Sequence, residues 1–427
     1  MRKLFTAVFL LAATLDVLSA QTDGVEISLD NKKYVEGIES VSLRNAEEKL
    51  SVPIGVLGQS TFVLDFDDLE LETRHLKYTF IHCTHDWKVS DLNQLEYIEG
   101  FNEEDITDYE HSFNTIEPYI HYHAEFPNEN ISFSKSGNYI LFVYDDSPDN
   151  PILTQRFMVL EPVAAKIVAD VHPATDVTER FKRQEVDFIL YPGSYQVRNP
   201  QLTLHATIQQ NGRWDNAKVG LTYRSGNPTE LYFDHKDGSN VFDGSAEFRT
   251  FDITTLRSNS DRIVGISFVN RHTHAYVLQD DARPYAAYES RGNMHGYRYF
   301  HNRDMANRCS EDYVFTHFTL KSDFPFSDGD VYVFGELTDW QIKEEAKLKY
   351  NSGFQFWETD ILLKQGAYNY QYVYVPRGSG IIDATYIEGS HFQTGNLYTI
   401  YVYYKEEGTS YDKLIGCLTT SLTAGGF

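Results

Sequence analysis

The stretch from Tyr78 to Tyr144 constrains the fold most, because it is rich in aromatic residues, punctuated by turns, and follows no helical pattern. Residues 78–82 and 139–144 are dense in aromatic and β-branched side chains, which fit a pleated, half-buried surface. Between them, aromatic residues recur in polar surroundings, which is typical of a long connection held against a sheet by packed rings. These residues are Trp87, Tyr97, Phe101, Tyr109, Phe113, Tyr119 and Tyr122.

The rest of the chain shows the same β pattern. Residues 38–43 and 62–66 alternate apolar and polar side chains, the period of a half-buried strand. Pro192-Gly193 and Asn211-Gly212 separate further short strands at a spacing typical of sandwiches. The sequence therefore predicts a mainly β fold built from tandem immunoglobulin-like β-sandwiches.

We expect four segments along the 427 residues. Arg2 and Lys3 precede a short apolar run, which predicts a secretory signal peptide. No later stretch reaches the ~18 apolar residues of a membrane span, so a soluble periplasmic protein is expected. The predicted segments are a signal peptide (1–20), an N-terminal β domain (23–162), a middle β-sandwich with long loops (163–310) and a C-terminal β-sandwich (311–427).

Charge and cysteine content narrow the classes of partner. The chain holds 37 Lys and Arg against 62 Asp and Glu, a net charge of −25. This charge would repel nucleic acid and anionic membrane surfaces, so neither is an expected partner, and no direct insertion into a membrane is expected. Three widely spaced cysteines exclude a disulfide framework and permit at most one bridge.

A series of short motifs resembles the plug protein of the type IX secretion system of Bacteroidetes. The motifs include His82-Cys83-x-x-Asp86-Trp87, Glu96-Tyr97-x-x-Gly100-Phe101, Ser112-Phe113-Asn114-Thr115, Tyr119-x-His121-Tyr122 and Ser136-Gly137-Asn138-Tyr139. Further matches at 211–217, 247–253, 281–285 and 296–297 extend the resemblance over most of the chain. We expect a mainly structural role for the motif residues His82, Trp87, Tyr97, Gly100, Phe101, Phe113, Asn114, Tyr122, Gly137, Asn138 and Tyr139.

The resemblance implies a non-enzymatic periplasmic subunit, peripheral to the outer membrane through its partner. Such a subunit closes the periplasmic opening of a giant outer-membrane translocon barrel when no cargo is in transit. Loops at the ends of sandwiches commonly carry variable contacts, so the loop from Asp86 to Asp105 is the candidate barrel contact. Its acidic residues would meet a basic rim on the partner: Asp86, Glu99, Glu103, Glu104 and Asp105.

The C-terminal segment suggests an alternative function. Residues 331–340 and 366–373 resemble an early-set sandwich of the glycogen-binding-module type, in which the Trp matching Trp340 can stack on a sugar ring. Gln371 stands where that family has a basic residue, and no second Trp follows the strand at 372–374. A carbohydrate-binding protein is therefore the alternative, although packing of Trp340 within its own domain is the favoured interpretation.

The sequence predicts neither a metal site nor a catalytic site, and no small-molecule ligand is expected. His82 and Cys83 are neighbours on a strand and should point to opposite faces. His121-x-His123 and His272-x-His274 offer two ligands each, whereas a zinc or copper site needs three or four. Nucleophile elbows, zinc-protease motifs and phosphate-binding loops are missing from the sequence. We therefore expect no cofactor and no enzymatic activity.

Overall fold

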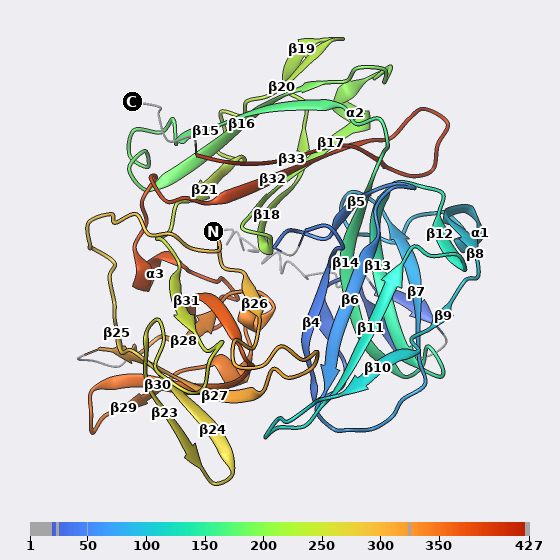
Figure 1. The fold of residues 1–427 in the computed structure, drawn as a ribbon. Helices are drawn as coiled ribbons and strands as arrows, with labels where there is room; N and C mark the ends of the chain where they lie inside the picture. The colour runs from blue at the N-terminus through green and yellow to red at the C-terminus, as the bar shows by residue number, and fades with distance from the viewer. Residues whose placement is uncertain (1–18, 23–24, 49, 323–325, 423–427) are drawn as a thin grey trace, which may run out of the picture.

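The computed structural model describes residues 19–22, 25–48, 50–322 and 326–422 (Figure 1). The expected signal peptide lies outside this range, apart from Ser19 and Ala20 in β1 (Ser19–Thr22), which pairs with β2 (Val25–Ser28). Strands dominate, and the α-helices among the described residues are four residues long: α1 (Gln94–Tyr97), α2 (Pro200–Thr203) and α3 (Thr385–Glu388). The predicted mainly β fold class is confirmed. No helix in the described part is long and apolar enough to cross a membrane.

The first unit (residues 25–160) is a sandwich of two antiparallel sheets with one parallel strand pair. One sheet consists of β10 (Asp108–His111), β11 (Ile120–Phe126), β6 (Phe62–Asp68) and β4 (Ile38–Asn45). The other consists of β3 (Lys32–Lys33), β14 (Pro151–Leu160), β13 (Gly137–Asp145), β7 (Leu76–Cys83) and β9 (Glu104–Asp105), with β5 (Ile54–Val56) parallel to β14. A small ribbon of β8 (Ile98–Gly100) and β12 (Ile131–Phe133) covers one end.

Aromatic rings fill the core of the first unit because the strands alternate. Along β7, Leu76, Tyr78 and Phe80 are buried and their neighbours are half-buried, as a period of two requires. The Phe80 ring lies 4.8–5.6 Å from those of Phe126, Phe133 and Phe157. Such ring pairs add stability beyond the area that they bury.

The middle unit (residues 166–243 and 397–421) is assembled from two distant stretches of chain. One sheet contains β15 (Lys166–Pro173), β16 (Arg183–Tyr191), β20 (Glu230–Phe233), β19 (Ser225–Asn227) and β21 (Val241–Asp243). The facing sheet contains β18 (Arg213–Thr222), β17 (Leu204–Gln210), β32 (Leu397–Tyr404) and β33 (Lys413–Ser421).

The third unit (residues 249–388) is inserted between β21 and β32. One sheet holds β22 (Arg249–Asp252), β31 (Gly366–Pro376), β26 (Arg298–Phe300) and β28 (Gly329–Phe334). The other holds β23 (Ile263–Val269), β24 (His272–Val277), β27 (Tyr313–Lys321), β30 (Phe356–Lys364), β29 (Lys349–Asn351) and β25 (Asp280–Asp281). Two 3-10 turns complete it: η1 (Glu336–Thr338) and η2 (Glu344–Ala346).

These pairings differ from the linear division at 163–310 and 311–427. β32 and β33 lie in the predicted C-terminal segment but pair in the sheet of β17, and β22 to β26 lie in the predicted middle segment but pair in the third unit. The reason is that β32 is buried on both faces: Ile400 and Val402 face the middle core, whereas Tyr401 and Tyr403 face the first unit. Residue order along the chain cannot reveal such a partner.

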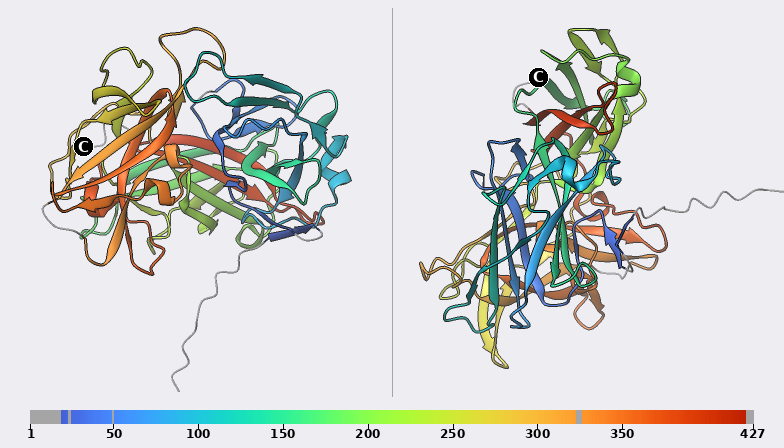
Figure 2. Two further views of the ribbon diagram at one scale, coloured as in Figure 1. Left: turned by 90° about the horizontal axis from the view of Figure 1, so that it is seen from below. Right: turned by 90° about the vertical axis from the view of Figure 1, so that its right-hand side faces the viewer.

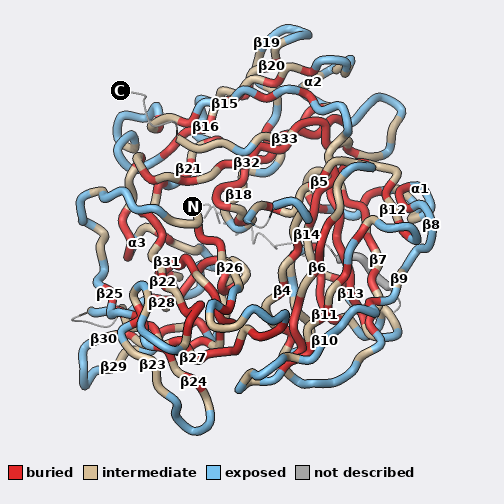
Figure 3. Tube along the Cα trace, in the orientation of Figure 1, coloured by how far each residue is buried: buried red, intermediate tan, exposed pale blue. Residues whose placement is uncertain are grey.

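The middle unit lies above the other two units, which stand side by side in Figure 1. The turned views of Figure 2 show the same arrangement. Buried residues gather along the strands of all three units, and exposed residues lie mainly in the connections and at the edges (Figure 3).

Candidate functional site

The adjacent motif residues His82 and Cys83 of β7 lie on opposite faces of one sheet. The ring of His82 points into the first core, where Nδ1 is 2.9 Å from Ser90 Oγ and Nε2 is 3.1 Å from the Ser136 carbonyl. Burial lowers the pKa of His82 to about 4. Cys83 points to the other face and packs beside Trp87. As the strand period predicts, the two side chains do not share a site.

That second face forms a junction with the middle unit, which we name the aromatic junction. The Trp87 and Trp214 rings meet edge to face with centroids 5.0 Å apart, and the Arg156 guanidinium lies 4.4 Å from the Trp87 centroid. Tyr403 donates a hydrogen bond of 2.8 Å to Asn138 Oδ1. Motif residues therefore join units as well as fill a core.

A second junction, between the first and third units, is charged, and we name it the charged junction. Asp67 of β6 is fully buried and receives bonds from Lys364 Nζ at 2.6 Å and Tyr313 Oη at 2.7 Å. His121 Nδ1 is 2.7 Å from the other carboxylate oxygen of Asp67. Burial would lower the pKa of His121, but Asp65 and Asp67 raise it to about 9.

The two His-x-His motifs are not brought together. His121 and His123 share a strand face as expected, but their rings bind the carboxylates of Asp65 and Asp67. His272 Nδ1 bonds Glu117, and His274 Nδ1 lies 2.9 Å from His317 Nε2. The expectation of no metal site from these pairs stays a prediction.

A buried ionic network in the third unit was not anticipated from the sequence. Glu388 is buried and accepts bonds from Arg249 and from Arg283 Nε at 2.6 Å. Burial would raise the pKa of Glu388, but Arg249 and Arg283 lower it to about 2. Arg249 also pairs with Asp280. The one signal available was the position of Arg249 within the motif match at 247–253.

Trp340, the candidate sugar-stacking residue, packs on neighbouring side chains. Its ring lies 5.5 Å from Phe334 and 6.0 Å from Phe248, and the Arg213 guanidinium lies 5.7 Å from its centroid. The ring edge also covers Gly296, where an added Cβ would lie 2.2 Å from the Trp340 ring. These contacts match the favoured packing interpretation.

The motif residues otherwise divide into buried and exposed groups. Tyr97, Tyr122 and Tyr139 are buried. Gly100 and Gly137 have φ of +98° and +132°, and a Cβ would strike the Asn130 carbonyl or the His82 ring. The backbone of Asn114 is also in the left-handed region, with φ of 58°. Phe101 and Phe113, however, are 64% and 53% exposed, so the expectation that they anchor the connection by packing is wrong. Each stands where the chain reaches the surface between two short strands.

The acidic loop is only partly available to a partner. Glu104 accepts a 2.5 Å hydrogen bond from Tyr78 and further bonds from Asn128 and Asn130. Glu103 binds Tyr144 and Lys77, while Asp86 binds Thr84 and Lys88. Glu99 and Asp105 remain exposed, as do the apolar side chains of Val89, Leu95 and Phe101. The loop therefore presents both apolar and acidic side chains.

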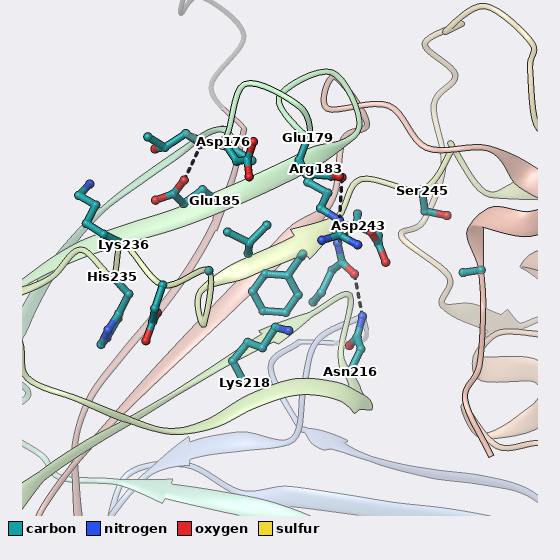
Figure 4. A pocket seen from close by; sticks show the side chains of 18 of the residues that line it. Asp176, Glu179, Arg183, Glu185, Asn216, Lys218, His235, Lys236, Asp243 and Ser245 are labelled. Atoms are coloured by element: carbon teal, nitrogen blue, oxygen red, sulfur yellow. Dashed lines mark hydrogen bonds and ion pairs between the residues drawn. The ribbon is translucent and has the colours of Figure 1, made fainter. Parts of the chain in front are cut away.

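A cavity of about 680 Å³ lies in the middle unit and at its border with the third (Figure 4). Charged side chains of both signs line it, and several already pair: Arg183 with Glu179 and Asp243, and Arg213 with Asp215. Part of its charge is therefore neutralised within the chain itself.

Comparison with known proteins defines the class. Residues 38–161 match the type 9 secretion system plug protein 1st domain. A crystal structure of a hypothetical protein from Parabacteroides merdae shares 33% identity, covers 92% of this chain and 100% of its own, and superposes with a TM-score of 0.87. The chain matches no curated protein. The protein is therefore a mainly β chain whose first domain is of the plug type.

Residues 38–161 belong to the type IX secretion system plug first-domain family, and the chain as a whole is similar to the P. merdae protein. The match of this domain to a secretion-system plug implies a non-catalytic role and is consistent with a periplasmic location.

Proposed function

We propose that this protein closes the periplasmic opening of the giant outer-membrane translocon barrel of the type IX secretion system when no cargo is in transit. The observation that carries the proposal is the match of residues 38–161 to the plug first domain. A seal needs shape and area, on the order of 1,000 Å² or more of buried surface, and not reactive groups.

The two junctions support this proposal because a plug has to keep its shape. The first unit contacts the middle unit through Trp87, Asn138 and His85, the last of which binds Asp412 at 3.0 Å. It contacts the third unit through Asp67, and Asp312 accepts bonds from the amides of Ile116 and Glu117. Buried bonds on two sides of one unit hold the three sandwiches in a fixed arrangement.

The carbohydrate alternative rests on Trp340, whose ring is already engaged by Phe334, Phe248 and Arg213. No specific observation favours it over the plug.

The decisive experiment measures outer-membrane permeability in four strains: the wild type, a deletion of this gene, a deletion of the barrel gene, and the double deletion. Deleting the gene for this chain should admit dyes and antibiotics that the outer membrane normally excludes, provided that the barrel is present. Deleting the barrel as well should restore exclusion, because the pore itself is then gone. Equal permeability in the wild type and in the strain that lacks only this chain would contradict the proposal.

Retention of the tagged protein on a glucan resin, without a co-purifying barrel, would favour the carbohydrate alternative.

A further inference from the structure

Three potential metal ligands lie close together on the sheet of the middle unit that contains β15 and β16. His172 of β15 stands directly opposite Glu185 of β16, and Asp187 is two residues further along β16. All three therefore lie on one face of the sheet. One ligand atom from each residue lies within 4.8 Å of the other two, and no other such group occurs in the described part of the chain.

The remaining polar atoms of these side chains are held by neutral groups. His172 Nδ1 lies 2.9 Å from the Pro173 carbonyl, an acceptor, so Nδ1 carries a proton, and Nε2 faces Asp187 Oδ2 at 3.3 Å. Asn240, which is fully buried, donates to Asp187 Oδ1 at 2.8 Å. The Thr175 amide donates to Glu185 Oε2 at 2.7 Å, and Figure 4 shows Glu185 beside this segment. Metal-binding histidines and carboxylates are commonly oriented by outer partners of this kind.

The cluster lacks a cation to balance its carboxylates. Glu185 is 3% exposed, and no Lys or Arg of the described residues forms an ion pair with Glu185 or Asp187. Asp170 stands opposite Asp187 and adds a further acid to the same sheet face. Burying uncompensated charge is costly. A proton on His172 offsets part of that cost, since the hydrogen bond to Asp187 raises the pKa of His172 to about 9. A divalent ion would offset more.

We propose that His172 Nε2 and carboxylate oxygens of Glu185 and Asp187 bind a divalent transition-metal ion of the zinc type. One imidazole and two carboxylates suit such an ion better than calcium or magnesium, which take oxygen ligands. Water completes the coordination, because His172 and Asp187 are only half-buried. The ion joins β15 to β16 and displaces the proton from His172. The inference is independent of the plug proposal.

Zinc titration of the purified protein by calorimetry tests the site. We expect one equivalent to bind, and His172→Gln, Glu185→Gln and Asp187→Asn each to weaken binding by about tenfold or more. The matched control is His123→Gln, which removes an imidazole from another His–carboxylate cluster, at Asp65. It should bind zinc like the wild type. Wild-type affinity in the three site variants would overturn the proposal.

Cobalt absorption keeps the test valid if a variant fails to fold. One equivalent of Co²⁺ should give visible d–d bands in the wild type and in His123→Gln, and zinc should abolish them. The proposal would also be overturned if the wild-type protein gave no cobalt bands at one equivalent and no heat of binding in the zinc titration. Loss of both signals in His123→Gln alone would place the metal at the charged junction instead.

Discussion

The aromatic and charged junctions hold the same first unit by different physics. Around Trp87, the contact consists of rings and apolar side chains, with the Arg156 guanidinium over the Trp87 ring and a neutral hydrogen bond from Tyr403 to Asn138. Around Asp67, it consists of a buried carboxylate that depends on Lys364, Tyr313 and His121. A ring contact loses stability roughly with the atoms removed, whereas a buried ion pair leaves an uncompensated charge when one partner is lost. The two junctions should therefore respond differently to mutation and to pH.

The largest effect is expected for Lys364→Met, which leaves the buried Asp67 carboxylate at the charged junction without its lysine partner. Removing one partner of a buried pair costs about 3–5 kcal/mol in the free energy of unfolding. Denaturant titration measures this loss. The control is Lys347→Met, since Lys347 pairs with Asp330 nearer the surface and a pair of that kind contributes about 0–1 kcal/mol. Equal, small losses in both variants would show that the charge of Asp67 is compensated elsewhere.

Trp87→Ala should weaken the aromatic junction by about 3–5 kcal/mol, the usual range for a buried aromatic side chain. Trp87 has a φ of 61°, a left-handed backbone that glycine adopts without strain. Trp87→Gly should therefore be less destabilised than Trp87→Ala, by about 1 kcal/mol. Thermal unfolding of the pair measures both effects. An unchanged melting temperature in Trp87→Ala, with loss of barrel binding, would instead make Trp87 a partner contact.

Two histidines of the first unit, one at the charged junction and one facing the core, should respond to pH with opposite signs. The folded state raises the pKa of His121 to about 9, so its contribution is complete below the unfolded value of 6.5 and is lost as pH rises through 9. The folded state lowers the pKa of His82, which contacts Tyr411 of the middle unit, to about 4. Its contribution is complete above pH 6.5 and is lost as pH falls through 4. Each loss amounts to about 3 kcal/mol at most.

Unfolding free energies measured between pH 4 and pH 10 separate these contributions. His121→Gln should flatten the alkaline limb and leave the acid limb, while His82→Gln should do the reverse. His172 also has a raised pKa and will keep part of the alkaline limb in His121→Gln. An alkaline limb unaffected by His121→Gln would show that the charged junction does not depend on this imidazole.

The aromatic junction was partly visible in the sequence, and the charged junction was not. Alternation at residues 38–43 and 62–66 and the aromatic content of residues 78–82 predicted the mainly β class, because period and side-chain type act locally. Tyr97 and Tyr122 were expected as packed rings, and both are buried. Lys364 ends an ordinary apolar strand, and its partner Asp67 lies about 300 residues away, so no local pattern connects them. For the same reason the return of β32 to the middle unit was missed. Phe101 was misassigned because an aromatic side chain in a motif does not reveal which face it occupies.

The smallest effect on stability is expected at the exposed loop, which belongs to neither junction. Glu103 and Glu104 hold Tyr144 and Tyr78, so reversing them would damage the core. Glu99 and Asp105 are exposed, and the double variant Glu99→Lys/Asp105→Lys should change stability by no more than about 0.5 kcal/mol.

If the loop meets a basic rim, this variant should bind the barrel more slowly and with weaker salt dependence. The control is Glu47→Lys/Glu48→Lys, which changes the net charge equally at another exposed turn of the same unit. Equal association rates for both variants in pull-down kinetics would remove the loop as a contact, whereas slowing in the loop variant alone would separate residues that hold the fold from residues that meet the partner.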